Sequence, residues 1–180
     1  GEIHEVGFAM YTNMLNAAVR ALKAGEKVPD LTQPLSITSE INLRVPALLT
    51  NDYCPDVHER LTLYKRLANC DGEDDLRAMQ EELIDRYGEM PAQTLALIET
   101  HRLRLTGRAL GLARLDAGPA AIQLQFVPNP PIDPAKIIRL LQSDRSFKLA
   151  GQDKLLWQKP SATLKERVGA VKELFNKLKP

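Results

Sequence analysis

The chain has 180 residues, enough for one large domain or two small ones, and a composition of 44% hydrophobic and 26% charged residues excludes a disordered protein. Its 24 basic residues nearly balance 23 acidic ones, so the chain lacks the large positive net charge of a protein that binds nucleic acid over much of its surface. We find no apolar run long enough to span a membrane, no signal peptide and only two cysteines, so we expect a cytoplasmic protein.

The first third of the chain predicts a helix, a linker and a strand. Apolar residues recur at three- and four-residue spacing over residues 7–24, and Gly25 would end that helix. Pro29 and Pro34 mark residues 26–34 as a linker. Residues 37–45 alternate apolar and polar side chains, as a half-buried strand does, and Pro46 ends the pattern.

Three helices are predicted to follow. The first begins near Pro55, the second covers about residues 73–87 and ends at Gly88, and the third runs from Pro91 towards Gly111. The periodicity of the first two predicts these inward-facing residues: Val57, Leu61, Tyr64, Leu67 and Ala68, then Leu76, Met79, Leu83 and Tyr87. The third runs through Leu95, Ile98, Arg102, Leu105 and Ala109.

The remainder of the chain alternates with a period of two in two places. Residues 112–127 and residues 146–157 predict two hairpins. Between them, Asp133 and Pro134 predict the start of a short helix, and Thr163 with Glu166 predicts a capping box on the last one. We therefore expect an α+β fold, with helices packed on a small antiparallel sheet built from a lone strand and two hairpins.

The sequence carries no motif for nucleotide binding, metalloprotease or serine hydrolase chemistry. A zinc site assembled from Cys54, His58, Cys70 and His101 would have no Cys-x-x-Cys pair to anchor it. A nucleophilic Cys70–His101 pair would have no third group to orient the imidazole. We expect no catalytic residue, no metal and no cofactor in this chain.

Four stretches, in this order and spacing, carry a family resemblance: EVGFAMYTNMLNAAVRALKAGE, then INLRVPALL with RLTLYKRLA, then EELIDRYGEMP, then LRLTGRALGL. They resemble the C-terminal (TRCF) domain of bacterial transcription-repair coupling factors (Mfd), with the first stretch similar to the end of the preceding translocase lobe. The resemblance implies three parts: residues 1–25 as the end of the second RecA-like lobe, 26–34 as linker and 35–180 as the C-terminal domain. A chain that begins at Gly1 rather than Met fits a fragment of a longer protein.

The resemblance implies an autoinhibitory role for a domain that is not itself an enzyme. The parent would be an ATP-dependent double-stranded DNA translocase that engages stalled RNA polymerase, with ATP and Mg bound in lobes this chain lacks. The domain would dock on the UvrB-like N-terminal module of the same protein. Docked there, it would mask the UvrA-binding surface and restrain ATPase activity and DNA binding until polymerase is engaged.

The docking contact implied by the family's ELIDR motif consists of Glu82, Asp85 and Arg86. These residues stand at i, i+3 and i+4, so they share one side of the predicted second helix, away from its apolar stripe. The two carboxylates would pair with arginines of the UvrB-like module, and Arg86 would offer a forked donor set.

The alternative function is a nucleic-acid-binding module. Arg102, Arg104 and Arg108 lie along the third helix, and the last helix adds further basic residues that would contact phosphates: Lys165, Arg167, Lys172, Lys177 and Lys179. Aromatic residues make up only 5% of the chain, which leaves no set of rings for stacking on bases.

Overall fold

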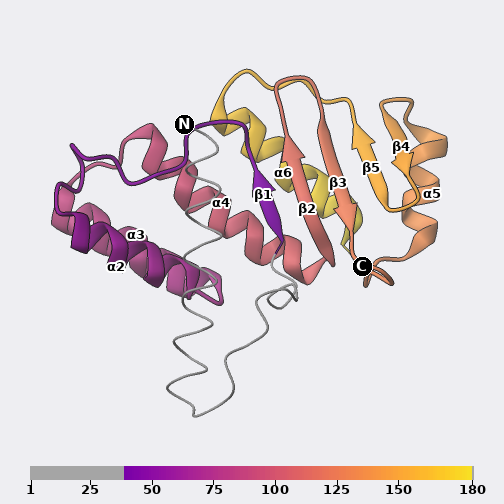
Figure 1. Ribbon diagram of the computed structural model, residues 1–180. Helices are drawn as coiled ribbons and strands as arrows, with labels where there is room; N and C mark the ends of the chain where they lie inside the picture. Colours follow the sequence, from indigo (N-terminus) through magenta and orange to yellow (C-terminus); the bar gives the residue numbers. More distant parts are fainter. Residues whose placement is uncertain (1–38, 180) are drawn as a thin grey trace, which may run out of the picture. The chain divides into compact units, whose positions relative to one another are not determined.

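The computed structural model describes residues 39–179, which divide into two compact units (Figure 1). The helical unit comprises residues 46–101, and the sheet unit comprises residues 39–45 and 102–179. The predicted helix over 7–24 and the predicted linker over 26–34 lie outside the described residues.

The helical unit contains α2 (Val57–Ala68), α3 (Glu73–Tyr87) and the first part of α4 (Ala92–Ala109). Asp56 caps α2, since its carboxylate accepts a hydrogen bond from the His58 amide at 2.8 Å. Acidic residues fill the first turn of α3, where they complement the helix dipole. Gly88 ends α3 with a φ of 87°, a conformation that glycine adopts without steric cost.

The core of the helical unit confirms the predicted inward face of α3 but not that of α2. Leu76, Met79 and Leu83 are buried. On α2, however, Leu63 and Leu67 are buried, whereas Val57 and Leu61 are 55% and 38% exposed. The predicted α2 stripe was therefore wrong for its first turns. On α4, Leu97 and Ile98 are buried, and Leu95 is 39% exposed.

The reason lies in the breadth of the apolar pattern on α2. Leu61 and Leu63 are about 160° apart around the helix, so both cannot face one core. Arg60 lies beside the buried face of α2 because its guanidinium donates to the Cys54 carbonyl at 2.8 Å and to the Pro55 carbonyl at 3.3 Å. These hydrogen bonds tie α2 to the segment that precedes it, a contact that the periodicity of the helix does not reveal.

The sheet unit confirms the α+β class and both predicted hairpins. Its strands are β1 (Glu40–Asn42), β2 (Leu112–Ala117), β3 (Ile122–Phe126), β4 (Phe147–Gly151) and β5 (Lys154–Trp157), in the order β1-β2-β3-β5-β4. The β2–β3 and β4–β5 pairs are antiparallel, but β1 pairs parallel with β2, so the sheet is mixed rather than wholly antiparallel. The unit also contains the second part of α4, from Arg102 onward, and the helices α5 (Pro134–Ser143) and α6 (Leu164–Leu178).

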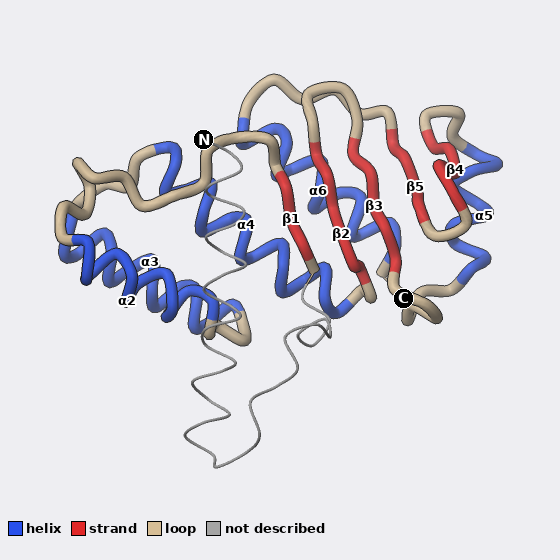
Figure 2. The backbone as a smooth tube through the Cα atoms, in the orientation of Figure 1, coloured by secondary structure: helices blue, strands red, loops and turns tan. Residues whose placement is uncertain are grey.

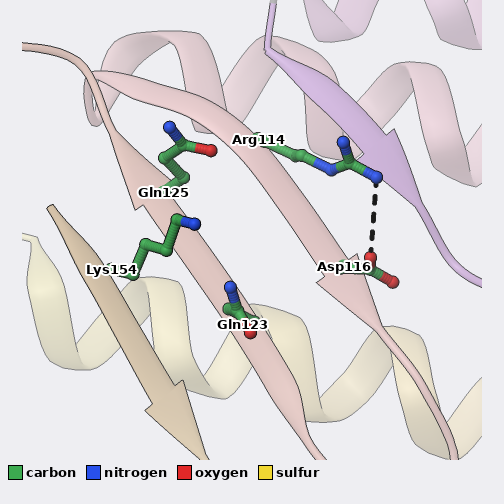
Figure 3. Close-up of a pocket in the computed structure, with 5 residues that line it drawn as sticks. All are labelled: Arg114, Asp116, Gln123, Gln125 and Lys154. Atoms are coloured by element: carbon green, nitrogen blue, oxygen red, sulfur yellow. Dashed lines mark ion pairs between the residues drawn. The ribbon is translucent and has the colours of Figure 1, made fainter. Parts of the chain in front are cut away.

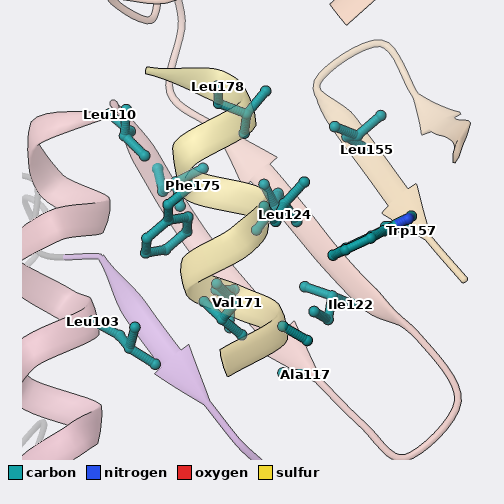
Figure 4. Packing of buried hydrophobic residues seen from close by; sticks show 14 of the residues in the cluster. Leu103, Leu110, Ala117, Ile122, Leu124, Leu155, Trp157, Val171, Phe175 and Leu178 are labelled. Carbon is teal, nitrogen blue, oxygen red and sulfur yellow. The ribbon is translucent and has the colours of Figure 1, made fainter. Parts of the chain in front are cut away.

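The two faces of the sheet differ in chemistry. Leu115, Leu124 and Leu155 are register partners on β2, β3 and β5, and all three are buried. Figure 4 shows α6 lying against this face, with Val171, Phe175 and Leu178 directed towards the strands. The adjacent register row on the opposite face is polar: Arg114, Gln125 and Lys154.

Helices α5 and α6 of the sheet unit begin as predicted. Asp133 caps α5, with its carboxylate accepting from the Ala135 amide at 3.0 Å, and Pro134 is the first helical residue. The Thr163 hydroxyl accepts from the Glu166 amide at 3.1 Å, and the Glu166 carboxylate accepts from the Ala162 amide at 2.8 Å. This is a capping arrangement whose return bond falls one residue earlier than in the usual box.

Candidate docking surface

The three predicted docking residues lie on the surface of α3, outside the core of the helical unit. The Glu82 and Arg86 side chains are 33% and 40% exposed, and Asp85 is exposed. Relative to the inward face formed by Leu76, Met79 and Leu83, the helical spacing puts Asp85 on the opposite side of α3 and Glu82 on its flank. Arg86, seven residues after Met79, borders the inward face and is nevertheless exposed. All three are therefore accessible from solvent.

Helix α2 lies beside α3 (Figure 2) and supplies Arg66, the closest partner of Glu82. Arg66 donates from Nη1 to Glu82 Oε2 at 2.5 Å and from Nη2 to Oε1 at 2.8 Å, a forked pair. Arg86, one turn further along α3, approaches Oε2 at 3.4 Å. The hydrogen bonds from Arg66 hold the pKa of the Glu82 carboxyl below its ordinary value, so the carboxylate form is favoured.

Glu59 on α2 binds Arg86, the residue that also approaches Glu82. Its Oε1 forms an ion pair with Arg86 Nη2, and its Oε2 accepts a hydrogen bond from the Tyr87 hydroxyl at 2.7 Å. Burial, together with this hydrogen bond, raises the pKa of Tyr87, which keeps the phenol protonated. Glu59, Arg86, Glu82 and Arg66 therefore alternate in charge between the two helices, and we call them the ionic ladder.

The ladder also fixes the relative direction of the two helices. Glu59, near the start of α2, meets Arg86 near the end of α3, while Arg66 in the last turn of α2 meets Glu82. The helices are therefore antiparallel. The Tyr53 hydroxyl, within 3.0 Å of the Leu83 carbonyl and 2.8 Å of the Gly88 carbonyl, holds the end of α3.

Asp85 differs from Glu82 in having no partner among residues 39–179. It lies about 60° around α3 from Glu82, further from α2. Asp74 and Glu81 are also exposed on this helix and likewise form no ion pair with a described residue. The outer side of α3 therefore presents carboxylates that form no ion pair with a described residue.

A groove of about 300 Å³ borders the ladder. It is lined by His58, Glu59, Thr62, Leu63, Arg66 and Arg86. Three of these residues belong to the ladder, so its charged groups can be reached from this groove as well as from the outer side of α3. Glu59 and Arg66 were missed by the sequence reasoning, because nothing in the sequence shows which turns of α2 and α3 face each other.

The described residues contain no metal-ligand cluster of three or more His, Cys, Asp or Glu side chains. Cys54 and Cys70 are buried in the helical unit and form no disulfide. Among residues 39–179 no helix combines the length and the apolar character needed to cross a bilayer.

The open face of the sheet unit carries a second, shallower depression of about 150 Å³ (Figure 3). Arg114 and Asp116 of β2, Gln123 and Gln125 of β3, and Lys154 of β5 line it. Asp116 lies 2.8 Å from Arg44 Nε and 3.7 Å from Arg114 Nη2. The depression is thus a solvated polar surface whose one carboxylate already has two cationic neighbours.

Two basic residues of the alternative nucleic-acid surface are buried. Arg104 is 9% exposed and Arg167 is 6% exposed. Arg167 donates to the Leu43 carbonyl at 2.8 Å and to the Ser161 hydroxyl at 3.0 Å, so its donors hold the sheet unit together. Neither guanidinium is presented to a phosphate backbone, which weakens the predicted basic patch on α4 and α6.

Comparisons with known proteins identify relatives of this chain and a solved structure with the same fold. The transcription-repair-coupling factor of Haemophilus influenzae is 36% identical over 97% of this chain, and that of Escherichia coli is 34% identical over 99%. The chain spans only 15% and 16% of the length of these two relatives. A crystal structure of the C-terminal domain of a transcription-repair coupling factor has the same fold, with a TM-score of 0.65 at 20% identity, covering 78% of this chain and 91% of that one.

The family comparison covers the ladder, the α3 motif and the first hairpin together. The model of the TRCF domain family matches residues 43–137, more than half of the chain. The chain belongs to the TRCF domain family.

Proposed function

We propose that this chain is the autoinhibitory docking domain of a transcription-repair coupling factor. In this proposal the outer side of α3, with Glu82, Asp85 and Arg86, binds the UvrB-like N-terminal module of the same protein. Docking masks the surface to which UvrA binds and restrains ATP hydrolysis and DNA binding until RNA polymerase is engaged. ATP and Mg belong to lobes outside this chain, and the chain itself supplies no catalytic group.

The observation that carries the proposal is the exposed carboxylate of Asp85 beside the half-exposed carboxylate of Glu82. The interior of the helical unit needs neither group, because its buried residues are apolar at the corresponding turns of α3. Membership of the TRCF family and the matching ELIDR motif support the assignment of a partner to these charges.

The chemistry suits a contact that must open. Exposed ion pairs contribute about 0.2–1 kcal/mol each, and charge-rich contacts form and separate more readily than large apolar seams. Several such pairs give a few kcal/mol, enough to keep a docked state dominant and still allow a competing partner to displace it. An apolar seam of the same area would favour permanent association.

The proposal is tested in the full-length coupling factor by reversing one charge. Glu82→Lys or Asp85→Arg places a cation against the arginines expected on the module, so we expect the docked state to open while the domain stays folded. UvrA binding and the ATPase rate should both rise. Values unchanged from wild type, with normal folding by circular dichroism, would show that these residues do not hold the inhibited state.

A further inference from the structure

The ionic ladder occupies one of the carboxylates that the docking proposal needs. Glu82 accepts both forked hydrogen bonds of Arg66, at 2.5 and 2.8 Å, and the longer contact of 3.4 Å from Arg86. Asp85 has no such partner among the described residues. A cation approaching α3 therefore finds one free carboxylate and one that already has a guanidinium bound in the preferred planar geometry.

We propose that Arg66 is an internal competitor that sets the strength of this docking surface. The inference rests on the proposed function: a partner arginine can bind Glu82 fully only by displacing Arg66 from it. Arg66 also repels that arginine, because a second guanidinium would have to come within a few ångströms of the first. The occupant of the surface is a cationic side chain, and Arg66 weakens its binding.

The geometry singles out Arg66 rather than Arg86 as the group that gives way. Arg86 is anchored by Glu59 in addition to Glu82, and it lies 5.1 Å from the Tyr87 ring centroid. Arg66 has Glu82 as its one ion-pair partner among residues 39–179, and its side chain is 45% exposed. Displaced from Glu82, Arg66 can be hydrated in the open groove beside it, whereas moving Arg86 would also leave Glu59 without its cation.

The consequence is that removing a positive charge from this domain tightens docking. In Arg66→Gln, the neutral side chain no longer forms the forked ion pair, and Glu82 becomes available. An exposed ion pair contributes at most about 1 kcal/mol, so we expect affinity for the module to rise by about two- to fivefold. The same change makes the inhibited state harder to open.

The test measures binding of the 180-residue chain to the separately expressed UvrB-like module by calorimetry. Arg66→Gln is compared with Arg77→Gln, which removes the same charge from an exposed position about 140° around α3 from Glu82. We expect the gain for Arg66→Gln only. Combined with Glu82→Gln, the substitution at Arg66 should lose its effect, because a double-mutant cycle reports the coupling between the two side chains.

The outcomes separate this inference from the function on which it rests. Weaker or unchanged binding by Arg66→Gln, while Asp85→Lys still abolishes binding, overturns the role of Arg66 and leaves the docking function standing. An equal gain in Arg77→Gln also overturns it, since the effect would then come from overall charge. If no form of the chain binds the module, both the inference and the docking function are wrong.

Discussion

Arg66 and Glu82 face each other across α2 and α3 through two hydrogen bonds, although 16 residues separate them in the sequence. This pair makes the candidate docking surface a property of two helices rather than of one motif. Arg66 lies on α2 and reaches Glu82 but not Asp85. Of the two carboxylates of the motif, Asp85 is therefore the more available to a partner.

The pair predicts a specific dependence of stability on pH. The hydrogen bonds from Arg66 lower the pKa of Glu82 in the folded chain below the unfolded value of about 4.3. Their stabilisation is therefore complete above pH about 4.3 and is lost as the pH falls through the lowered pKa. We expect the unfolding free energy of Glu82→Gln to depend less steeply on pH in that acidic window than that of wild type.

Urea titrations at several acidic pH values make this measurement, with Glu81→Gln as control. Glu81 is the adjacent residue of α3 and has no ion-pair partner among the described residues. An acid dependence for Glu82→Gln identical to that of wild type would mean that the ladder adds nothing to stability in solution.

Arg167 is predicted to be a structural residue rather than a phosphate ligand. In Arg167→Ala the buried Leu43 carbonyl loses its 2.8 Å donor, which costs about 1–3 kcal/mol of unfolding free energy. Lys165→Ala, two residues earlier and exposed, should change stability by less than about 0.5 kcal/mol. Thermal melts of both variants would distinguish them, and equal melting temperatures would contradict the assignment.

The connection from α4 to β2 depends on a glycine. Gly111 has a φ of 74°, and a Cβ there would lie 2.6 Å from Cδ of Pro131. Gly111→Ala should therefore destabilise the chain by more than about 1 kcal/mol. Gly169→Ala, within α6 and with nothing within 4 Å of the added Cβ, should stabilise it by about 0.4–1 kcal/mol. Denaturant unfolding should give the two effects opposite signs.

The burial of Arg104 and Arg167 predicts weak contact with nucleic acid. We expect no retention of duplex DNA by the 180-residue chain in a gel shift at about 150 mM salt, where surface charges are well screened. Tight binding that falls steeply with added salt would instead support the alternative function, because such steepness measures released counterions.

Much of the fold follows from local patterns. The α3 bounds, the two hairpins and the capped start of α5 were each predicted, since each depends on spacing or turn residues within one short segment. The lone strand was predicted too, but not its parallel pairing with β2. Register partners such as Glu40 and Arg114 are brought together only by the complete fold. The alternation of apolar and polar residues in a strand does not show whether it pairs parallel or antiparallel with its neighbour.

Some residues of the candidate docking surface could be predicted from the sequence and others could not. Helical spacing predicted that Glu82, Asp85 and Arg86 share a side of α3, and in the structure Asp85 and Arg86 are exposed and Glu82 is half-exposed, with Arg86 at the border of the inward face. The partners Glu59 and Arg66 could not be predicted, because the inward face of α2 was assigned to the wrong residues. With Val57 and Leu61 placed inward, the side of α2 that faces α3 would have been a different one.

The most direct test of the docking surface reverses the charge of Asp85, because this carboxylate can bind a partner without first leaving another residue of the chain. A tagged 180-residue chain captures the UvrB-like module, and the capture is repeated with Asp85→Lys and with Asp52→Lys, an exposed residue in the turn that precedes α2. We predict that wild type and Asp52→Lys retain the module and that Asp85→Lys releases it. Equal retention by all three folded proteins would contradict the docking surface on α3.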